Sequence, residues 1–289
     1  MPKYIKCNLC GGEKTRIIQK AEEPYKVVKC KICGLVYVNP QPTQEELLTF
    51  YKKEYYREWI EKQKNARIYL WKKRLKDLEK YKIRKKGELI IRHISVAKAQ
   101  VLLDVGCGNG EFLELARKIY QVDATEISPF AGEYVKKALG IEVHYGDLTT
   151  LNLAPDTYDI ITMWHTFEHM PEPPENLKEA RRILKDDGML IIEVPNLNAY
   201  IGRAIYRIVK RRQEHLFSIY DREPHLFHFS PSTLKEILKR AGFKVIKCSP
   251  EISQIFWQKK LVEYIGIILH RLTGVNIGGT IRVYASKGD

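Results

Sequence analysis

The sequence predicts an α/β fold with a small metal-binding unit ahead of it, and three observations support this prediction. Residues 103–110 read L-D-V-G-C-G-N-G, between the apolar run 101–103 and a helical pattern that begins near Glu111. This order indicates a strand, a glycine turn and a helix start. A second apolar run, 122–126, ends in an acid about 20 residues beyond the turn. Two Cys-x-x-Cys pairs lie near the N-terminus.

The glycine turn predicts where a ligand binds. Gly106, Gly108 and Gly110 leave the backbone without Cβ atoms, so a flat, polar ligand can lie against the main chain and the first helical amides. Glu126 stands at the distance from which an acid accepts hydrogen bonds from both hydroxyls of a ribose. Together these features indicate an adenosine cofactor. A dinucleotide site would need G-x-G-x-x-G, and position 111 is a glutamate, so nicotinamide binding is disfavoured.

The stretch from about residue 90 to 195 resembles the class I (Rossmann-like) S-adenosylmethionine-dependent methyltransferases. In that resemblance Glu126 is the ribose-binding acid and Asp147, in Y-G-D-L, lies beside the adenine amino group. Residues 158–164 and 189–194 match the fourth and fifth strands. The resemblance implies a Rossmann-like seven-stranded, mostly parallel sheet with helices on both faces, and S-adenosyl-L-methionine as cofactor. The cofactor-binding residues it implies are Asp104, Gly106, Cys107, Gly108, Gly110, Glu126, Ile127, Asp147, Leu148 and Trp164.

The two cysteine pairs predict a structural zinc ion. Cys7 and Cys10 are separated from Cys30 and Cys33 by a spacing typical of a four-thiolate zinc ribbon. Disulfides are the competing interpretation, but a reducing compartment would keep these thiols reduced. Catalytic zinc is disfavoured, because four thiolates leave no open coordination position.

Residues 33–42, C-G-L-V-Y-V-N-P-Q-P, resemble the zinc-knuckle leader found ahead of methyltransferase domains in sugar and cell-surface biosynthesis. The resemblance implies a small polar acceptor, a nucleotide-linked or lipid-linked sugar, methylated on oxygen or carbon. We expect three units: a zinc-ribbon leader at 1–42, a helical basic connector at 43–98, and a methyltransferase domain at 99–289 with the insertion 196–230 as a substrate lid.

Helical patterns run through the connector. Thr43 and Glu46 form a predicted capping box for a helix that reaches Tyr51. Tyrosines at the end of this helix could form a wall of the substrate site, but packing of the leader on the main domain is preferred for Tyr51, Tyr55 and Tyr56. Further along, one apolar stripe is predicted to lie on the domain surface with basic side chains facing outward, at Ile68, Trp71, Leu75 and Leu78.

The net charge of the chain indicates a class of possible partners but does not identify one. The formal net charge is +14, and the basic excess lies mainly in the connector. An anionic partner such as nucleic acid, a phosphorylated substrate or a lipid surface would account for this excess, and so would a solvated helix face. The sequence lacks a secretory signal pattern, and its most apolar late segment, 261–272, is too short to cross a bilayer. We expect a cytoplasmic protein.

Two histidine clusters are candidates for the general base that a hydroxyl acceptor requires. The first follows the fourth predicted strand, where His165 is the candidate and Glu168 and His169 brace the loop. The second lies near the end of the insertion, where related sugar methyltransferases place a Glu-His pair. Here a proline separates Glu223 from His225, so the pair is interrupted and His225 is the preferred base, while His228 is expected to be structural.

The remaining segments complete the predicted architecture. Residues 200–212 form an amphipathic basic helix that could lie on an anionic membrane. The preferred interpretation is a lid whose basic side chains steer a diphosphate, with Arg203, Arg207 and Arg211. A packing role is expected for 255–272. Residues 243–248 give a sixth strand, and 280–286 give a last strand that the resemblance places antiparallel beside the fifth.

We therefore expect S-adenosylmethionine-dependent methyl transfer to a small polar acceptor. A ribosomal or transfer RNA methyltransferase is the first alternative, because some of those enzymes also have a zinc ribbon and a basic connector would suit phosphate contacts. A noncatalytic cofactor-binding or scaffolding protein is the second. Peripheral membrane contact and the oligomeric state are left open.

Overall fold

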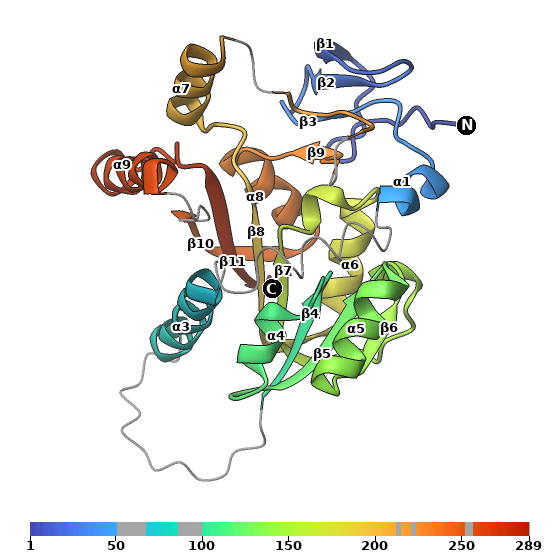
Figure 1. Ribbon diagram of the computed structural model, residues 1–289, viewed down its shortest axis with the longest axis vertical. Coiled ribbons are helices and arrows are strands. Elements are labelled where there is room, and N and C mark those ends of the chain that lie inside the picture. Colours follow the sequence, from blue (N-terminus) through green and yellow to red (C-terminus); the bar gives the residue numbers. More distant parts are fainter. Residues whose placement is uncertain (51–67, 86–99, 212–214, 221–223, 252–256, 289) are drawn as a thin grey trace.

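The computed structural model describes residues 1–50, 68–85, 100–211, 215–220, 224–251 and 257–288. At its centre lies a seven-stranded sheet with the strand order β10-β11-β8-β7-β4-β5-β6 (Figure 1). The strands are β4 (Val101–Val105), β5 (Gln121–Glu126), β6 (Val143–Tyr145), β7 (Tyr158–Trp164), β8 (Leu184–Pro195), β10 (Phe243–Glu251) and β11 (Thr280–Lys287). Neighbours from β8 through β6 are parallel, and β11 is antiparallel to both β8 and β10. The predicted sheet, including the antiparallel last strand beside the fifth, is confirmed.

Both faces of the sheet are covered by helices. Successive strand residues point to opposite faces, so Leu102 packs in a cluster with the helix residues Leu78 and Phe112, whereas Leu103 packs in the cluster of Leu177 and Leu234. The first face carries α3 (Ile68–Lys85) and α4 (Glu111–Ala116), and the second carries α6 (Pro173–Ile183) and α8 (Pro231–Arg240). A further helix, α5 (Pro129–Leu139), packs on β5 and β6. Strands buried on both faces explain the continuous apolar runs in the sequence.

A second, four-stranded sheet joins the N-terminal segment to the insertion. Its order is β1-β2-β3-β9, with β1 (Thr15–Lys20), β2 (Lys26–Cys30), β3 (Val36–Val38) and β9 (Phe227–His228). Tyr37 of β3 pairs with Phe227 of β9, and their rings stack at 6.2 Å. Strands from the leader and from the end of the insertion therefore form one sheet. The division of the chain into units at residue 42 stays a prediction.

The connector agrees with its prediction in the capping box and differs from it in α3. The capping box ahead of α1 (Gln44–Phe50) is confirmed, because the Thr43 amide donates to Glu46 Oε2 at 2.7 Å and the Glu46 amide donates to Thr43 Oγ1 at 3.2 Å. In α3, however, Arg74 is buried and Ile68 is 43% exposed. The predicted stripe was wrong at Ile68, and the basic face is not wholly outward, because a buried carboxylate described below draws Arg74 inward. Tyr51, Tyr55 and Tyr56 lie outside the described residues.

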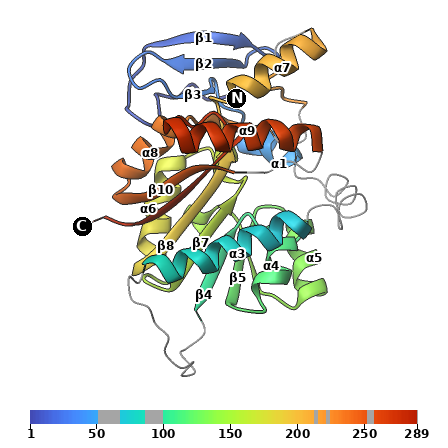
Figure 2. The ribbon, with the colours of Figure 1, turned by 90° about the vertical axis from the view of Figure 1, so that its left-hand side faces the viewer.

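Two helices lie on the outer side of the molecule, α7 (Tyr200–Lys210) and α9 (Trp257–Thr273), and they contact each other (Figure 2). Two short 3₁₀ helices, η1 (Leu148–Thr150) and η2 (Phe167–His169), follow β6 and β7. Among the helices that the structure describes, none combines the length and apolar character needed to cross a bilayer.

Candidate functional site

The turn between β4 and α4 requires its glycines. Gly106, Gly108 and Gly110 have φ values of 71°, 57° and 76°, a left-handed conformation that other residues rarely adopt. A Cβ atom on Gly106 would come within 2.5 Å of the Thr166 side chain. The amide of Gly106 donates to the Thr125 carbonyl at 2.9 Å, which ties the turn to β5. The glycines thus allow a closely packed turn that the neighbouring strand holds in place.

Glu126 holds this turn from the end of β5. Its carboxylate is 3% exposed, and it accepts hydrogen bonds from the Gly108 amide at 2.8 Å and from the Ser128 amide at 2.9 Å. Each carboxylate oxygen can accept more than one hydrogen bond. The residue can therefore position the glycine turn, begin α5 and still bind hydroxyl groups of a ligand. Ile127, between the two contacts, is half-buried.

The other predicted cofactor residues lie at the same edge of the sheet. Asp104 is buried and accepts a hydrogen bond from Thr162 Oγ1 at 2.6 Å; burial raises the pKa of its carboxyl to about 7. Asp147 follows β6 and accepts from the Thr149 amide at 3.0 Å, capping η1. The carboxyl ends of β7, β4, β5 and β6 bring the set together, where open parallel sheets bind ligands. Three further members of the set, Cys107, Leu148 and Trp164, are buried.

His165 leaves β7 directly and lies between two carboxylates. Its φ is 52° and its side chain is 34% exposed. The ring nitrogen Nδ1 lies 3.5 Å from Glu168 Oε1, and Nε2 lies 3.3 Å from Glu193 Oε1. Loss of solvent works to lower the pKa of His165, but the two carboxylates outweigh it and raise that pKa. His165 is therefore suited to carry a positive charge between the two carboxylates.

Glu168 is a buried carboxylate in contact with histidines. Its side chain is 1% exposed, and neither oxygen accepts a hydrogen bond from the described residues. His169 Nδ1 lies 2.9 Å from the Pro224 carbonyl, which can only accept, so Nδ1 carries a proton and Nε2 is turned toward Glu168 Oε1 at 4.0 Å. Burial works to raise the pKa of Glu168, but the contact with His165 and the other imidazoles lower it.

His225 joins this group from the insertion. Its ring lies 4.8 Å from the ring of His169 in an edge-to-face arrangement, and one of its nitrogens lies within 4.8 Å of the nearest polar atoms of Glu168 and His169. Burial, assisted by His169, lowers the pKa of His225 to about 4. The two predicted histidine clusters are therefore one cluster around Glu168. Glu223, the other predicted catalytic residue, lies outside the described residues.

His228 belongs to the second sheet. It is 7% exposed in β9 and pairs with Val36 of β3. Burial lowers its pKa well below the usual histidine value. It lies where a structural residue is expected.

Sequence reasoning missed a buried ion network beneath the histidines. Glu193, near the end of β8, is fully buried and pairs with Arg74 of α3 and with Arg282 Nε at 2.7 Å. Arg74 and Arg282 also lie over the indole of Trp164, with their Cζ atoms 5.0 and 5.4 Å from a ring centroid. The sequence contains a signal for this network, because a charged residue interrupts each of the apolar strand segments I-I-E-V and I-R-V. Burial of a charge in a strand requires a partner.

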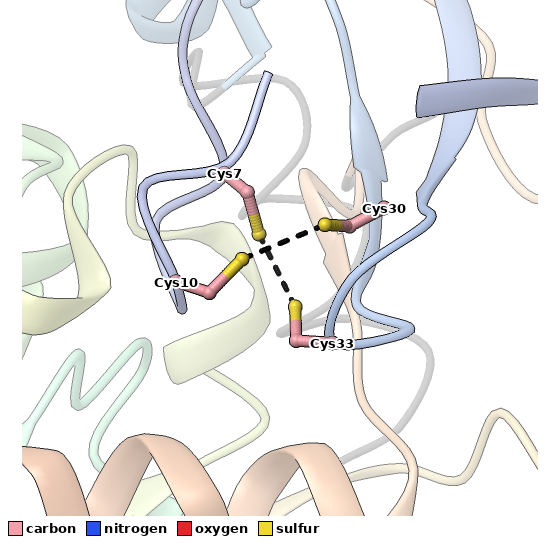
Figure 3. Close-up of side chains that lie close together, drawn as sticks. All are labelled: Cys7, Cys10, Cys30 and Cys33. Carbon is pink, nitrogen blue, oxygen red and sulfur yellow. Dashed lines mark hydrogen bonds between the residues drawn. The ribbon is translucent and has the colours of Figure 1, made fainter. Parts of the chain in front are cut away.

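Four cysteines converge beside the second sheet, on the turn before β1 and at the turn between β2 and β3 (Figure 3). Cys7 Sγ lies 3.4 Å from Cys33 Sγ, and Cys10 Sγ lies 3.6 Å from Cys30 Sγ; all four thiols are free. Tetrahedral zinc with its usual bonds to sulfur separates the sulfurs by about 3.8 Å. Each cysteine pair lies on a tight turn closed by a main-chain hydrogen bond. The Gly11 amide donates to the Cys7 carbonyl at 2.7 Å, and the Gly34 amide donates to the Cys30 carbonyl at 3.1 Å. The donor set and its spacing fit a closed, four-thiolate metal site.

Comparison with known proteins identifies the domain. The model of the family described as "Methyltransferase domain" matches residues 57–247. The chain is 27% identical over 165 residues to a ubiquinone biosynthesis O-methyltransferase of Pseudomonas putida, covering 54% of this chain and 69% of that protein. It is 28% identical over 159 residues to the enzyme of the same name from Coxiella burnetii, covering 52% and 65%.

Solved structures are also similar. One of them, an S-adenosylmethionine-dependent methyltransferase from Archaeoglobus fulgidus, is 21% identical with a TM-score of 0.46, and the match covers 76% of this chain and 99% of that one. The family match covers the glycine turn, the Glu126 strand and the histidine cluster. The chain therefore belongs to the methyltransferase domain family, and its domain is of the S-adenosylmethionine-dependent class.

Proposed function

We propose that this protein transfers the methyl group of S-adenosylmethionine to a hydroxyl oxygen of a small polar acceptor, a nucleotide-linked or lipid-linked sugar. The O-methyltransferase names of its relatives favour oxygen over carbon. One observation carries the proposal: His225, held neutral by burial, lies beside the buried carboxylate Glu168 at the edge of the sheet where the glycine turn also lies.

The cofactor would be held by the glycine turn and Glu126. S-adenosylmethionine supplies, when bound, a methyl group on a positively charged sulfur. The main chain at 106–110 would lie along it, the Glu126 carboxylate would accept hydrogen bonds from the ribose hydroxyls, and Asp147 would lie beside the adenine. Thr166 packs against Gly106, so the cofactor side and the histidine side are in direct contact.

The histidine side would handle the proton of the acceptor. A neutral imidazole can take a proton as the oxygen–methyl bond forms, and His225 is neutral at physiological pH. The imidazolium so formed would be buried, and the nearby carboxylate of Glu168 would stabilise it. We assign His225 as the base, Glu168 as its positioning and charge-balancing residue, and His165 as a lining residue held by Glu168 and Glu193.

The cysteine cluster supports this side indirectly. We infer that it binds one structural Zn²⁺, because four thiolates at tetrahedral spacing leave no position for a substrate. The same sheet pairs β3 with β9, two residues after His225. Zinc would therefore help to hold the segment that presents the base, which explains why a leader of this kind precedes an acceptor site.

Identification of the methylated product tests the proposal. The full chain, with labelled S-adenosylmethionine and fractionated extract of the source cell, should label a sugar nucleotide or a sugar-bearing lipid, and His225→Gln should abolish the label. Label in RNA, with binding to bulk RNA that weakens steeply as salt rises, would support the RNA methyltransferase alternative. Cofactor binding with methylation unaffected by His165→Gln and His225→Gln would support a noncatalytic role.

A further inference from the structure

The outer helix α9 presents large apolar side chains to solvent. Ile265, Ile268 and Leu272 follow one another at spacings of three and four, so they lie along one face. They are 40%, 54% and 77% exposed. Tyr264 beside them and Val275 just beyond the helix are about half exposed as well. We call these five residues the α9 stripe. A contiguous exposed stripe of this kind marks an interaction surface.

The opposite face of α9 is already used for packing. Glu263 is 3% exposed, and Gly266 approaches the chain so closely that a Cβ atom on it would lie 2.9 Å from Gly278 Cα. Rotating the helix to bury the α9 stripe would place these two residues in solvent and bring side chains against Gly278. The stripe is therefore the outward face of a helix that is fixed by its inner face.

On α7 and α9, the charged side chains that the structure describes as exposed are all basic. Helix α7, which contacts α9, has no acidic residue, and its exposed side chains include Arg207 and Ile208. Arg211 at its C-terminus and Arg271 on α9 are also exposed. In α9 the single acid is the buried Glu263. Exposed apolar and basic side chains of this kind match the surface of an anionic bilayer.

Both helices are attached to the acceptor edge of the sheet. Asn196 follows β8 directly, and its side chain donates to the Gly278 carbonyl at 2.7 Å while its amide donates to Gly279 at 2.9 Å. The turn after α9 is thus tied to the strand end that carries Glu193 beside His165. Helix α7 begins at Tyr200, shortly after the same strand end.

We propose that α7 and the α9 stripe form a docking surface for an anionic lipid bilayer. The stripe would enter the headgroup region, and Arg207, Arg211 and Arg271 would contact lipid phosphates. Docking in this way would bring the acceptor edge of the sheet to the membrane. The inference concerns lipid binding by the chain and goes beyond the transfer reaction proposed above, because it is testable without acceptor or cofactor.

Vesicle sedimentation with the full-length protein tests the docking surface. The protein should sediment with vesicles of phosphatidylcholine mixed with phosphatidylglycerol, and much less with phosphatidylcholine alone. Arg207→Glu and Arg271→Glu should each weaken binding at least about fivefold. Ile268→Glu and Leu272→Glu, both at exposed positions that a charge can occupy without unfolding the helix, should each weaken it at least about tenfold.

Ile119→Glu is the matched control, because Ile119 is 43% exposed and lies between α4 and β5, whereas α9 contacts β10 at the other end of the strand order. It should bind vesicles as the unchanged protein does. Absence of binding to anionic vesicles, or equal losses in Ile119→Glu and Leu272→Glu, would overturn the proposal. A dimer in lipid-free solution that Leu272→Glu dissociates would assign the stripe to a second copy of the chain instead. Methylation of a soluble acceptor is measured separately, so failure of docking leaves the transfer proposal standing.

Discussion

Two carboxylates at the carboxyl edge of the sheet have opposite surroundings. Glu126 accepts hydrogen bonds from two main-chain amides, one two residues along the chain and one on the glycine turn. Glu168 is equally buried but accepts none from the described residues, and its neighbours are three histidines from two distant segments. The glycine turn is thus held by main-chain hydrogen bonds, whereas the proposed acceptor side holds a buried carboxylate whose partners are imidazoles.

This difference has a chemical meaning. A rigid main-chain surface favours binding of a cofactor in every catalytic cycle, because preorganised groups lose little entropy on binding. A proton that moves during the reaction needs a site whose charge can change, and the buried Glu168 can balance a charge that appears on His225 only transiently. Substitutions on the two sides should therefore affect cofactor binding and catalysis separately.

The largest effect should follow loss of the thiolate site. Cys30→Ser should release the metal, so metal analysis should change from one zinc per chain to none. Structural zinc sites contribute about 10–16 kcal/mol of binding free energy in zinc-finger peptides, and the second sheet should unfold without it. Cys248→Ser is the control and should retain zinc, since Cys248 lies in β10 away from the cluster. Zinc retained in Cys30→Ser would contradict the assignment.

Substitution of His225 should separate chemistry from cofactor binding. His225→Gln should lower kcat about 10²- to 10⁴-fold, the usual contribution of a general base, while calorimetric affinity for S-adenosylmethionine stays within about twofold. His144→Gln, at a partly exposed position on β6, is the control. A parallel loss of cofactor affinity would mean that the two sides of the site are not independent.

Glu193→Gln should act on stability first. It would leave Arg74 and Arg282 buried without their shared carboxylate, and breaking such a pair costs about 3–5 kcal/mol. Urea unfolding measures the loss. Glu175→Gln, which removes an exposed partner of Lys178, should change the unfolding free energy by less than about 1 kcal/mol. Equal effects of the two substitutions would show that the network is not important for stability.

Glu126→Ala should weaken cofactor binding without altering the proposed base, His225. Loss of hydrogen bonds to a charged group costs about 1.5–3 kcal/mol, so the Kd for S-adenosylmethionine should rise about 10- to 150-fold by calorimetry. Glu133→Ala, which removes an exposed carboxylate on α5 bonded to Tyr145, should leave the isotherm unchanged. An unchanged isotherm in Glu126→Ala would contradict the ribose contact.

The smallest effect concerns pH. Because burial lowers the pKa of His225 to about 4, the base stays unprotonated from pH 6 to 8, and kcat/KM should show no loss from its protonation in that range. A base with the ordinary histidine pKa of about 6.5 would lose activity about fourfold between pH 8 and pH 6. Such a loss, absent in His225→Gln, would place the base in a more solvated environment than the structure shows.

The turn and the acid proposed to hold the cofactor could be predicted to lie together because their determinants are local. Gly106, Gly108, Gly110 and Glu126 belong to one strand–turn–helix–strand unit, and parallel pairing brings their strand ends to one edge without further information. The cysteine pairs are equally local, since each lies on a single tight turn. Spacing alone expresses these constraints, and the structure reproduces the fold that they predicted.

Contacts between distant segments could not be predicted in this way. Spacing along the chain was enough to predict the glycine turn, the succession of strands and the four thiols. Three contacts became visible only in the folded chain: His225 lies beside Glu168, β9 completes the sheet next to the cysteines, and Arg74 turns inward to Glu193. They could not be predicted because a buried charge requires a partner but does not specify which segment supplies it. That choice depends on which segments the strand order brings together.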